Sequence, residues 1–290
     1  MNRVSGGAPL GNTPLGSAAP GNPAAGSAAA GTPSAGGAPR TAQGSAPAPL
    51  LRRILLQGQY ETITMLRNGE QLILAIVMPL LARVGLTVTP LLDGLGSSRI
   101  NVAVPGILAL CAMSTAFTGQ GISTGFDRRY GVLRFLSTTP LGRTGLIAGK
   151  ILAVLAVLFL QVLIVTVVAL PLGWRPEPAG LVPGLAILVL GAAAFTALGL
   201  LVAGTVRPEA TLAITNLLWI LLGALGGIVI PAERLPALAQ AVVHFLPSGA
   251  LGQALRDAFL HGSVDAAAVF VLLLWTAIAG GAATRWFKWN

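Results

Sequence analysis

Long apolar runs separated by short polar stretches dominate the chain after residue 70. Each run is about 20 residues long, which is the length that a helix needs to cross the hydrocarbon core of a bilayer. The pattern predicts six transmembrane helices, at Gln71–Leu91, Val102–Ser123, Gly149–Leu172, Gly180–Gly204, Ala210–Ile230 and Val264–Thr284. We therefore predict an all-α membrane protein, with its six-span domain over residues 71–290.

Residues 49–70 have a different, amphipathic pattern with helical spacing. One stripe of this helix would carry Leu51, Ile54, Leu55, Gly58, Thr62, Met65 and Leu66, and the opposite face Arg53, Gln57, Tyr60 and Arg67. Because Arg52, Arg53 and Arg67 lie beside a membrane span, they favour contact with anionic headgroups. We predict an N-terminal helix that lies in the membrane interface, and a soluble lead-in helix is the alternative.

Residues 1–48 consist almost entirely of Gly, Ala, Pro, Ser and Thr. Such a segment lacks the apolar side chains that would offset the entropy of ordering it, so we expect a disordered tail. It also lacks the continuous apolar core of a signal peptide. We expect this tail to stay in the cytoplasm.

Composition and charge support the membrane assignment and orient the chain. Hydrophobic residues make up 54% of the chain and charged residues only 9%, against about 25% in soluble domains. The net charge is +9, but the basic residues lie between the apolar runs and do not gather on one soluble face. Nucleic-acid binding is therefore not expected. With the N-terminus inside, the basic residues on the cytoplasmic side are Arg52, Arg53, Arg67, Arg128, Arg129, Arg134, Arg143, Lys150, Arg207, Arg285 and Lys288, and those outside are Arg99, Arg175, Arg234 and Arg256. This asymmetry predicts that both termini are cytoplasmic.

Several kinds of chemistry are disfavoured by the sequence. Every Asp and Glu falls outside the six predicted spans, which argues against ion-driven transport. His244 and His261 have no third ligand nearby, so ordinary loop histidines are expected rather than a metal site. Cys111 is the single cysteine and can form neither a disulfide nor a cysteine metal site within the chain. The nearest match to a phosphate loop, residues 144–151, lacks its first glycine and its hydroxyl, so we expect no ATPase in this chain.

The cytoplasmic stretch FDRRYGVLRFLSTTPLGR at residues 126–143, followed by Gly149 and Lys150, resembles the cytoplasmic loop of type-2 ABC transporter permeases. The resemblance continues through Asn216, the segment GALGGIVIP at residues 223–231, and HFLPSGALGQALRDAF at residues 244–259. It covers the chain from about residue 50 onward. Val132 departs from the small polar residue expected there.

The resemblance implies a permease that works as a homodimer or with a related permease subunit, and that pairs with a separate ABC ATPase. ATP and magnesium would bind in that partner, and no cofactor is expected in this chain. The interfacial helix and the loop at 125–148 would contact the ATPase. The coupling residues would be Phe126, Asp127, Arg128, Tyr130, Gly131, Leu133, Arg134 and Pro140.

The residues themselves support this role for the loop. On a helix that starts near Gly125, Phe126, Tyr130 and Leu133 share one face and could pack into a groove. A solvated charged turn is the alternative.

Residues 231–262 are broken by prolines but remain apolar, and they contain two segments suited to short helices. In the family such a pair forms an external re-entrant hairpin, and two helices lying flat on the outer surface are the alternative. Arg83 lies within the first predicted span, where it either snorkels outward or serves a pathway or subunit contact. Asn216, Gly223 and Gly227 are candidates for a pathway or dimer contact.

These observations predict the permease subunit of an ATP-driven exporter, which moves an apolar or amphipathic substrate by alternating access. A membrane-anchored scaffold that recruits a cytoplasmic partner, and a passive channel, are alternatives. Arginine far outnumbers lysine, and Ala and Gly are abundant, which is typical of GC-rich bacterial genomes. We therefore expect a bacterial plasma membrane.

Overall fold

The predicted apolar runs correspond to long helices in the computed structural model, which describes residues 48–67, 99–228, 232 and 235–287. Within these ranges every regular element is helical. The first predicted span, Gln71–Leu91, lies outside the described residues, as do Arg83 and nearly all of the predicted tail. The prediction of an all-α fold is confirmed for the described part.

Five helices of the described part are long and apolar enough to cross a membrane. The first is continuous through α3 (Arg99–Met113), a π-helical segment η2 (Ser114–Gly119) and α4 (Gln120–Arg129). The others are α6 (Gly142–Ala169), α7 (Leu181–Thr205), α8 (Pro208–Leu225) and α11 (Ala266–Trp286). Sequence signals mark their starts: Pro208 occupies the first turn of α8, and the Asp265 carboxylate accepts the Ala267 and Ala268 N–H groups at the start of α11.

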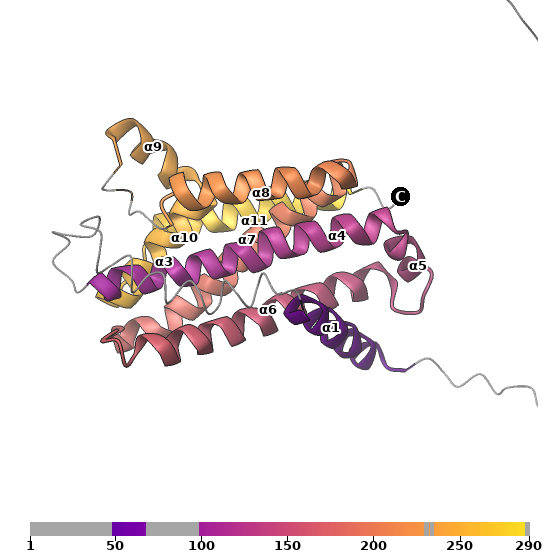
Figure 1. Ribbon diagram of the computed structural model, residues 1–290, viewed down its shortest axis with the longest axis horizontal. Coiled ribbons are helices and arrows are strands. Elements are labelled where there is room, and N and C mark those ends of the chain that lie inside the picture. The colour runs from indigo at the N-terminus through magenta and orange to yellow at the C-terminus, as the bar shows by residue number, and fades with distance from the viewer. Residues whose placement is uncertain (1–47, 68–98, 229–231, 233–234, 288–290) are drawn as a thin grey trace, which may run out of the picture. The chain divides into compact units, whose positions relative to one another are not determined.

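Helix α7 is central, and α3, α4, α10 and α11 pack around it (Figure 1). Small residues allow this close packing. A β-carbon on Gly199 of α7 would lie only 2.7 Å from the Phe117 carbonyl oxygen, and one on Gly121 of α4 would lie 2.9 Å from the Thr215 methyl of α8. Phe117 and Phe195 fill the adjacent core, with ring centroids 6.5 Å apart.

Two predicted span ends are wrong, and α6 begins at Gly142 rather than at Gly149. The first described span continues past Ser123 to Arg129, so Asp127 lies inside a candidate membrane helix, contrary to the prediction that all carboxylates lie outside. Glu209 also lies inside one, in the first turn of α8. The charge of Asp127 is tolerated there because Lys150 faces it. Helix α8 ends at Leu225 rather than near Ile230, because Gly227 adopts a left-handed conformation with φ +78°.

The early end of α8 also changes the interpretation of its glycines. Gly227 lies beyond the helix and so forms no four-residue repeat with Gly223 on one helix face. A β-carbon on Gly223 would lie 3.4 Å from Leu110 and 3.5 Å from Met113 of α3. Gly223 therefore faces a neighbouring helix of the same chain. Asn216 is half-buried on α8.

The predicted external hairpin contains two short helices, as expected. They are α9 (Ala237–Phe245) and α10 (Pro247–Arg256), and a π-helical turn η5 (Asp257–His261) follows α10. Helix α10 is buried and packs against α3, α7 and α11, whereas α9 projects outward with Leu238 and Phe245 exposed (Figure 1). The flat-lying alternative therefore fits only α9, because α10 lies among the candidate membrane spans.

The N-terminal helix α1 (Leu50–Arg67) confirms that the predicted helix forms. It lies along α6, where a β-carbon on Gly58 would lie 2.6 Å from Leu152. The buried positions of α1 are Gly58, Glu61 and Met65. Leu51 and Leu55, expected on one stripe with Gly58, are exposed.

Candidate functional site

The stretch expected to couple the permease to an ATPase does not form one helix. Helix α4 ends at Arg129, Gly131 is left-handed with φ +71°, and a separate short helix α5 (Val132–Ser137) follows. Gly142, with φ +66°, then leads into α6. The predicted single stripe of Phe126, Tyr130 and Leu133 is therefore wrong, because the left-handed glycine turns α5 away from α4.

The large side chains of this loop divide between core and surface. Leu133 is buried against Leu141 and Leu146. Phe126 and Tyr130 remain exposed and stack on each other, with ring centroids 6.2 Å apart. Phe135 is 70% exposed and was missed, although its place two residues after Leu133 puts it on the opposite side of α5. The exposed aromatic side chains of the loop are thus Phe126, Tyr130 and Phe135.

The arginines of the loop have different environments. Arg128 donates hydrogen bonds to the carbonyl oxygens of Ala203 and Val206, at 2.6 and 2.9 Å, and so binds the last turn of α7. It was expected to contact a partner, but its guanidinium is engaged within the chain. Arg129 lies 3.9 Å from Glu209 with both side chains largely exposed, and Arg134 is exposed.

One contact joins the two regions that were predicted separately. Arg53, on helix α1, donates a hydrogen bond to the carbonyl oxygen of Pro140 in the loop. Arg52 and Arg67 are exposed on α1. Helix α1 and the loop therefore form a continuous surface.

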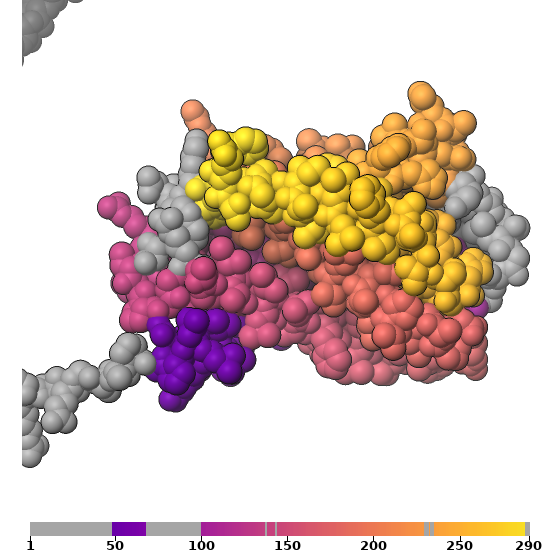
Figure 2. Space-filling model, turned by 180° about the vertical axis from the view of Figure 1, so that it is seen from behind, coloured from indigo at the N-terminus to yellow at the C-terminus, as the bar shows by residue number. Residues whose placement is uncertain are grey.

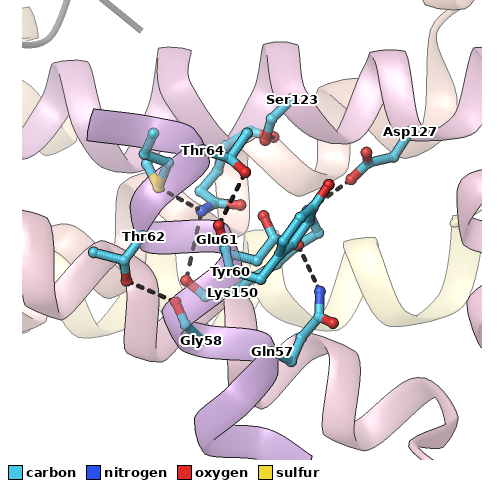
Figure 3. Close-up of polar contacts among 11 residues, drawn as sticks. Gln57, Gly58, Tyr60, Glu61, Thr62, Thr64, Ser123, Asp127 and Lys150 are labelled. Carbon is cyan, nitrogen blue, oxygen red and sulfur yellow. Dashed lines mark hydrogen bonds and ion pairs between the residues drawn. The ribbon is translucent and has the colours of Figure 1, made fainter. Parts of the chain in front are cut away.

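Beneath this surface lies a cluster of three charged side chains, Lys150 of α6, Glu61 of α1 and Asp127 of α4 (Figure 3). The Lys150 Nζ atom is 3.0 Å from Glu61 Oε1 and 2.8 Å from Asp127 Oδ2. Lys150 and Glu61 are buried, and the Asp127 side chain is 27% exposed. Gln57 also donates to Glu61 Oε1 at 3.0 Å. We call these three residues the charged cluster.

Burying the charged cluster costs desolvation free energy, and removing one of its residues takes a partner from at least one of the others. Moving an ion out of water costs several kcal/mol, and this cost is repaid only by close, well-directed partners. One ammonium here serves two carboxylates, which would repel each other without it. Since the three residues come from α1, α4 and α6, the charged cluster fixes these helices to one another.

Sequence reasoning assigned these residues different roles or none. Lys150 was counted as a cytoplasmic-side charge and as part of the family resemblance, Asp127 as a contact for the ATPase, and Glu61 was not singled out. A usable signal was present: Lys150 lies at the start of a long apolar run, where a buried lysine requires an acidic partner. Gly58 and Gly149 lie close to the cluster residues in sequence and permit the close approach of α1 and α6.

The segment that resembles a phosphate loop, residues 144–151, lies within α6. Its backbone N–H groups are therefore engaged in a helix rather than arranged around an anion. The Lys150 ammonium, which would contact phosphates in such a loop, binds two carboxylates instead.

A second buried cation lies at the other end of the helices. Arg256, 5% exposed at the end of α10, donates to the Gly227 and Ile228 carbonyl oxygens at 2.9 and 3.2 Å. These carbonyls follow the interrupted end of α8, so Arg256 binds α10 to it. The neighbouring Asp257 is partly buried, which raises the pKa of its carboxyl, and His261 Nδ1 is 3.5 Å from it.

The described residues contain no group of three His, Cys, Asp or Glu side chains that could hold a metal ion. A search among curated proteins found no match. The sequence does match the family of ABC-2 type transporters over residues 53–260, which is more than half of the chain and includes the charged cluster, the loop and the α9–α10 hairpin. The chain therefore belongs to the ABC-2 type transporter family, as a membrane permease.

Proposed function

We propose that this chain is the permease subunit of an ATP-driven exporter and that a separate ABC ATPase drives it through the surface formed by α1 and the loop. The observation that carries the proposal is the charged cluster. Lys150 holds Glu61 of α1 and Asp127 at the base of the loop within 3.0 Å. A force applied to either element would therefore reach α6, which is a candidate membrane span.

The exposed aromatic side chains of the loop support the same proposal. Phe126, Tyr130 and Phe135 expose large apolar area where a soluble partner could cover it. Arg134 and Arg52 add positive charge that would set the register with an acidic groove. ATP and magnesium would bind in the ATPase, and the ATPase-driven displacement would switch the spans between inward-open and outward-open states.

The proposed orientation places both termini and the loop in the cytoplasm of a bacterial cell, with the α9–α10 hairpin outside. The permease would act as a homodimer or beside a related permease subunit. Its substrate would be apolar or amphipathic, since the charged residues of the described candidate spans lie towards the ends of these helices. They are Asp127, Arg128, Arg129, Lys150, Glu209 and Arg285. A scaffold that recruits a cytoplasmic protein is the second candidate, because the exposed aromatic side chains would serve it equally well.

The decisive experiment removes the charges of the cluster while keeping its shape. The triple variant Lys150→Met, Glu61→Gln, Asp127→Asn leaves no unpaired buried ion, so the permease should accumulate normally. We expect transport per ATP hydrolysed to fall by about fivefold, a usual size for lost coupling between sites. Arg129→Gln, which changes an exposed charge of the same loop, is the matched control.

Copurification of the ATPase, ATP hydrolysis and export by membrane vesicles are measured on the same preparations. Unchanged export per ATP in the triple variant would remove the cluster from the coupling mechanism. An ATPase that binds the parent permease without any substrate-stimulated hydrolysis or export would favour the scaffold instead.

A further inference from the structure

A cavity of about 530 Å³ lies between α6, α7 and α11, and one end of it reaches the core beneath the loop. It exists because α11 packs along α7, whereas α6 packs mainly on α1 and leaves space beside α7. Figure 2 looks onto the side of the molecule where α11, in yellow, lies above α6, in pink. The walls are aliphatic over most of their extent and include Leu155, Val189, Ala193 and Leu200.

The cavity is long and narrow. Its lining residues extend from Leu146 to Leu155 on α6, from Val189 to Leu200 on α7 and from Thr276 to Phe287 on α11. At 1.5 Å per residue, the α7 and α11 stretches each cover about 16 Å. This length is close to half of the hydrocarbon thickness of a bilayer, about 15 Å of about 30 Å. The cavity therefore matches the depth of one leaflet.

The two ends of the cavity differ in polarity. Near the loop it is lined by Thr124, Lys150 and Thr284. The Thr124 hydroxyl is buried and has no hydrogen-bond partner among the described residues. Farther along the spans the lining is mostly aliphatic, with Thr196 and Thr276 as exceptions, and the Thr276 hydroxyl donates to the Leu272 carbonyl oxygen of its own helix. The cavity is thus mainly apolar along its length, whereas its charged lining residue, Lys150, and the Thr124 hydroxyl lie at the end near the loop.

Water is a poor occupant of such a space, because most of the lining offers no hydrogen bonds. An empty cavity of this size would forfeit the dispersion contacts of its walls. A lipid chain entering from the same leaflet would restore these contacts, and its ester group would lie at the polar end, within reach of the Thr124 hydroxyl.

We propose that this cavity is a binding site for one acyl chain of a bilayer phospholipid from the leaflet on the loop side. The bound chain packs against Leu133 and Leu146, which line the cavity and form the small core beneath the loop. Phospholipid binding therefore supports the position of α5. The site is separate from the transport proposal, since it requires only that the permease lies in a bilayer.

The chain offers a closely matched pair of variants. Gly280 lines the cavity, and a β-carbon there would meet only Ala197 at 4.0 Å, so leucine can be accommodated and would fill part of the space. Gly281 is exposed, does not line the cavity, and a β-carbon there would meet nothing within 4 Å. Gly280→Leu and Gly281→Leu therefore make the same chemical change inside and outside the proposed site.

The test uses the full chain without an ATPase, in vesicles of phosphatidylethanolamine and phosphatidylglycerol with a trace of a phospholipid that carries a diazirine in one acyl chain. After illumination, labelled peptides are identified by mass spectrometry. The α7 segment 189–200 forms the floor of the cavity and contains the buried residues Ala192 and Thr196. Phe159 and Leu163, exposed on α6, report general lipid contact.

We expect labelling of residues 189–200 in the parent chain and in Gly281→Leu, and a several-fold loss in Gly280→Leu while labelling of Phe159 and Leu163 stays constant. If Gly280→Leu does not accumulate, Ala197→Leu fills the cavity from the opposite wall. Absence of label from the α7 floor in the parent, or equal label in the filled variant, would overturn the proposal. Either result leaves the coupling proposal untouched, because no ATPase takes part.

Discussion

The helical unit holds a buried cation at each end, and the two cations are stabilised in different ways. At the loop end, Lys150 binds the carboxylates of two other helices. At the hairpin end, Arg256 binds two successive backbone carbonyls after α8. Lysine is a compact point charge that can lie between two anions, whereas the planar guanidinium of arginine suits adjacent acceptors.

This difference distinguishes a contact that can break and re-form during movement from one that holds its helices in place. The partners of Lys150 are side chains on α1 and α4, so the contact can break and form again while each helix stays intact. The partners of Arg256 are backbone groups freed by the break at Gly227, so losing the contact leaves buried carbonyls without donors. We expect movement at the loop end and rigidity at the hairpin end.

The largest effect is expected from Lys150→Met alone. It leaves the buried Glu61 and the partly buried Asp127 carboxylates without a cation between them, and breaking a buried ion pair in this way costs about 3–5 kcal/mol of unfolding free energy. Thermal unfolding in detergent micelles measures the loss. The neutral triple variant with Glu61→Gln and Asp127→Asn should recover most of it, and a triple variant as unstable as the single one would show that lysine acts through packing alone.

A smaller loss is expected from Leu133→Ala, which tests whether α5 is anchored by its apolar side. Leu133 is 1% exposed in the core beneath the loop, and removing a buried leucine costs about 2–5 kcal/mol, towards the lower end where neighbours can collapse. Phe135→Ala is the matched control on the exposed side of α5 and should leave the unfolding temperature nearly unchanged. Equal losses from both variants would contradict the orientation of α5.

The sequence predicted the helices better than their contacts. Apolar runs and prolines placed all five of the described spans and both hairpin helices, because composition over about 20 residues decides whether a helix suits a membrane. The single stripe in the loop was wrong, since a left-handed Gly131 can interrupt a helical pattern without changing the spacing of its apolar residues. The charged cluster was missed because its members are up to 89 residues apart, from Glu61 to Lys150, and only packing brings them together.

At the hairpin end, Arg256→Lys keeps the positive charge but loses the planar guanidinium group with its paired N–H donors. A lysine ammonium cannot align with both the Gly227 and Ile228 carbonyls, so we expect a loss of about 1.5–3 kcal/mol, the usual contribution of hydrogen bonds to a charged group. Faster amide hydrogen exchange in α10 would locate the effect. Exchange in α1 should not change, and a rise there would mean that the two ends are not independent.

The smallest effect is expected from Arg129→Gln, which removes a charge that lies in the same loop as the cluster but is exposed. Arg129 and Glu209 are 3.9 Å apart with side chains 48% and 64% exposed, so water and salt screen their attraction. We expect a change in unfolding free energy below about 0.5 kcal/mol, the usual range for exposed pairs. Glu209→Gln should give the same small change, and the double variant should add nothing, because neither partner loses a buried contact. A loss comparable to that of Lys150→Met would show that burial does not distinguish these charges, and the distinction between the two ends of the molecule would then lose its physical basis.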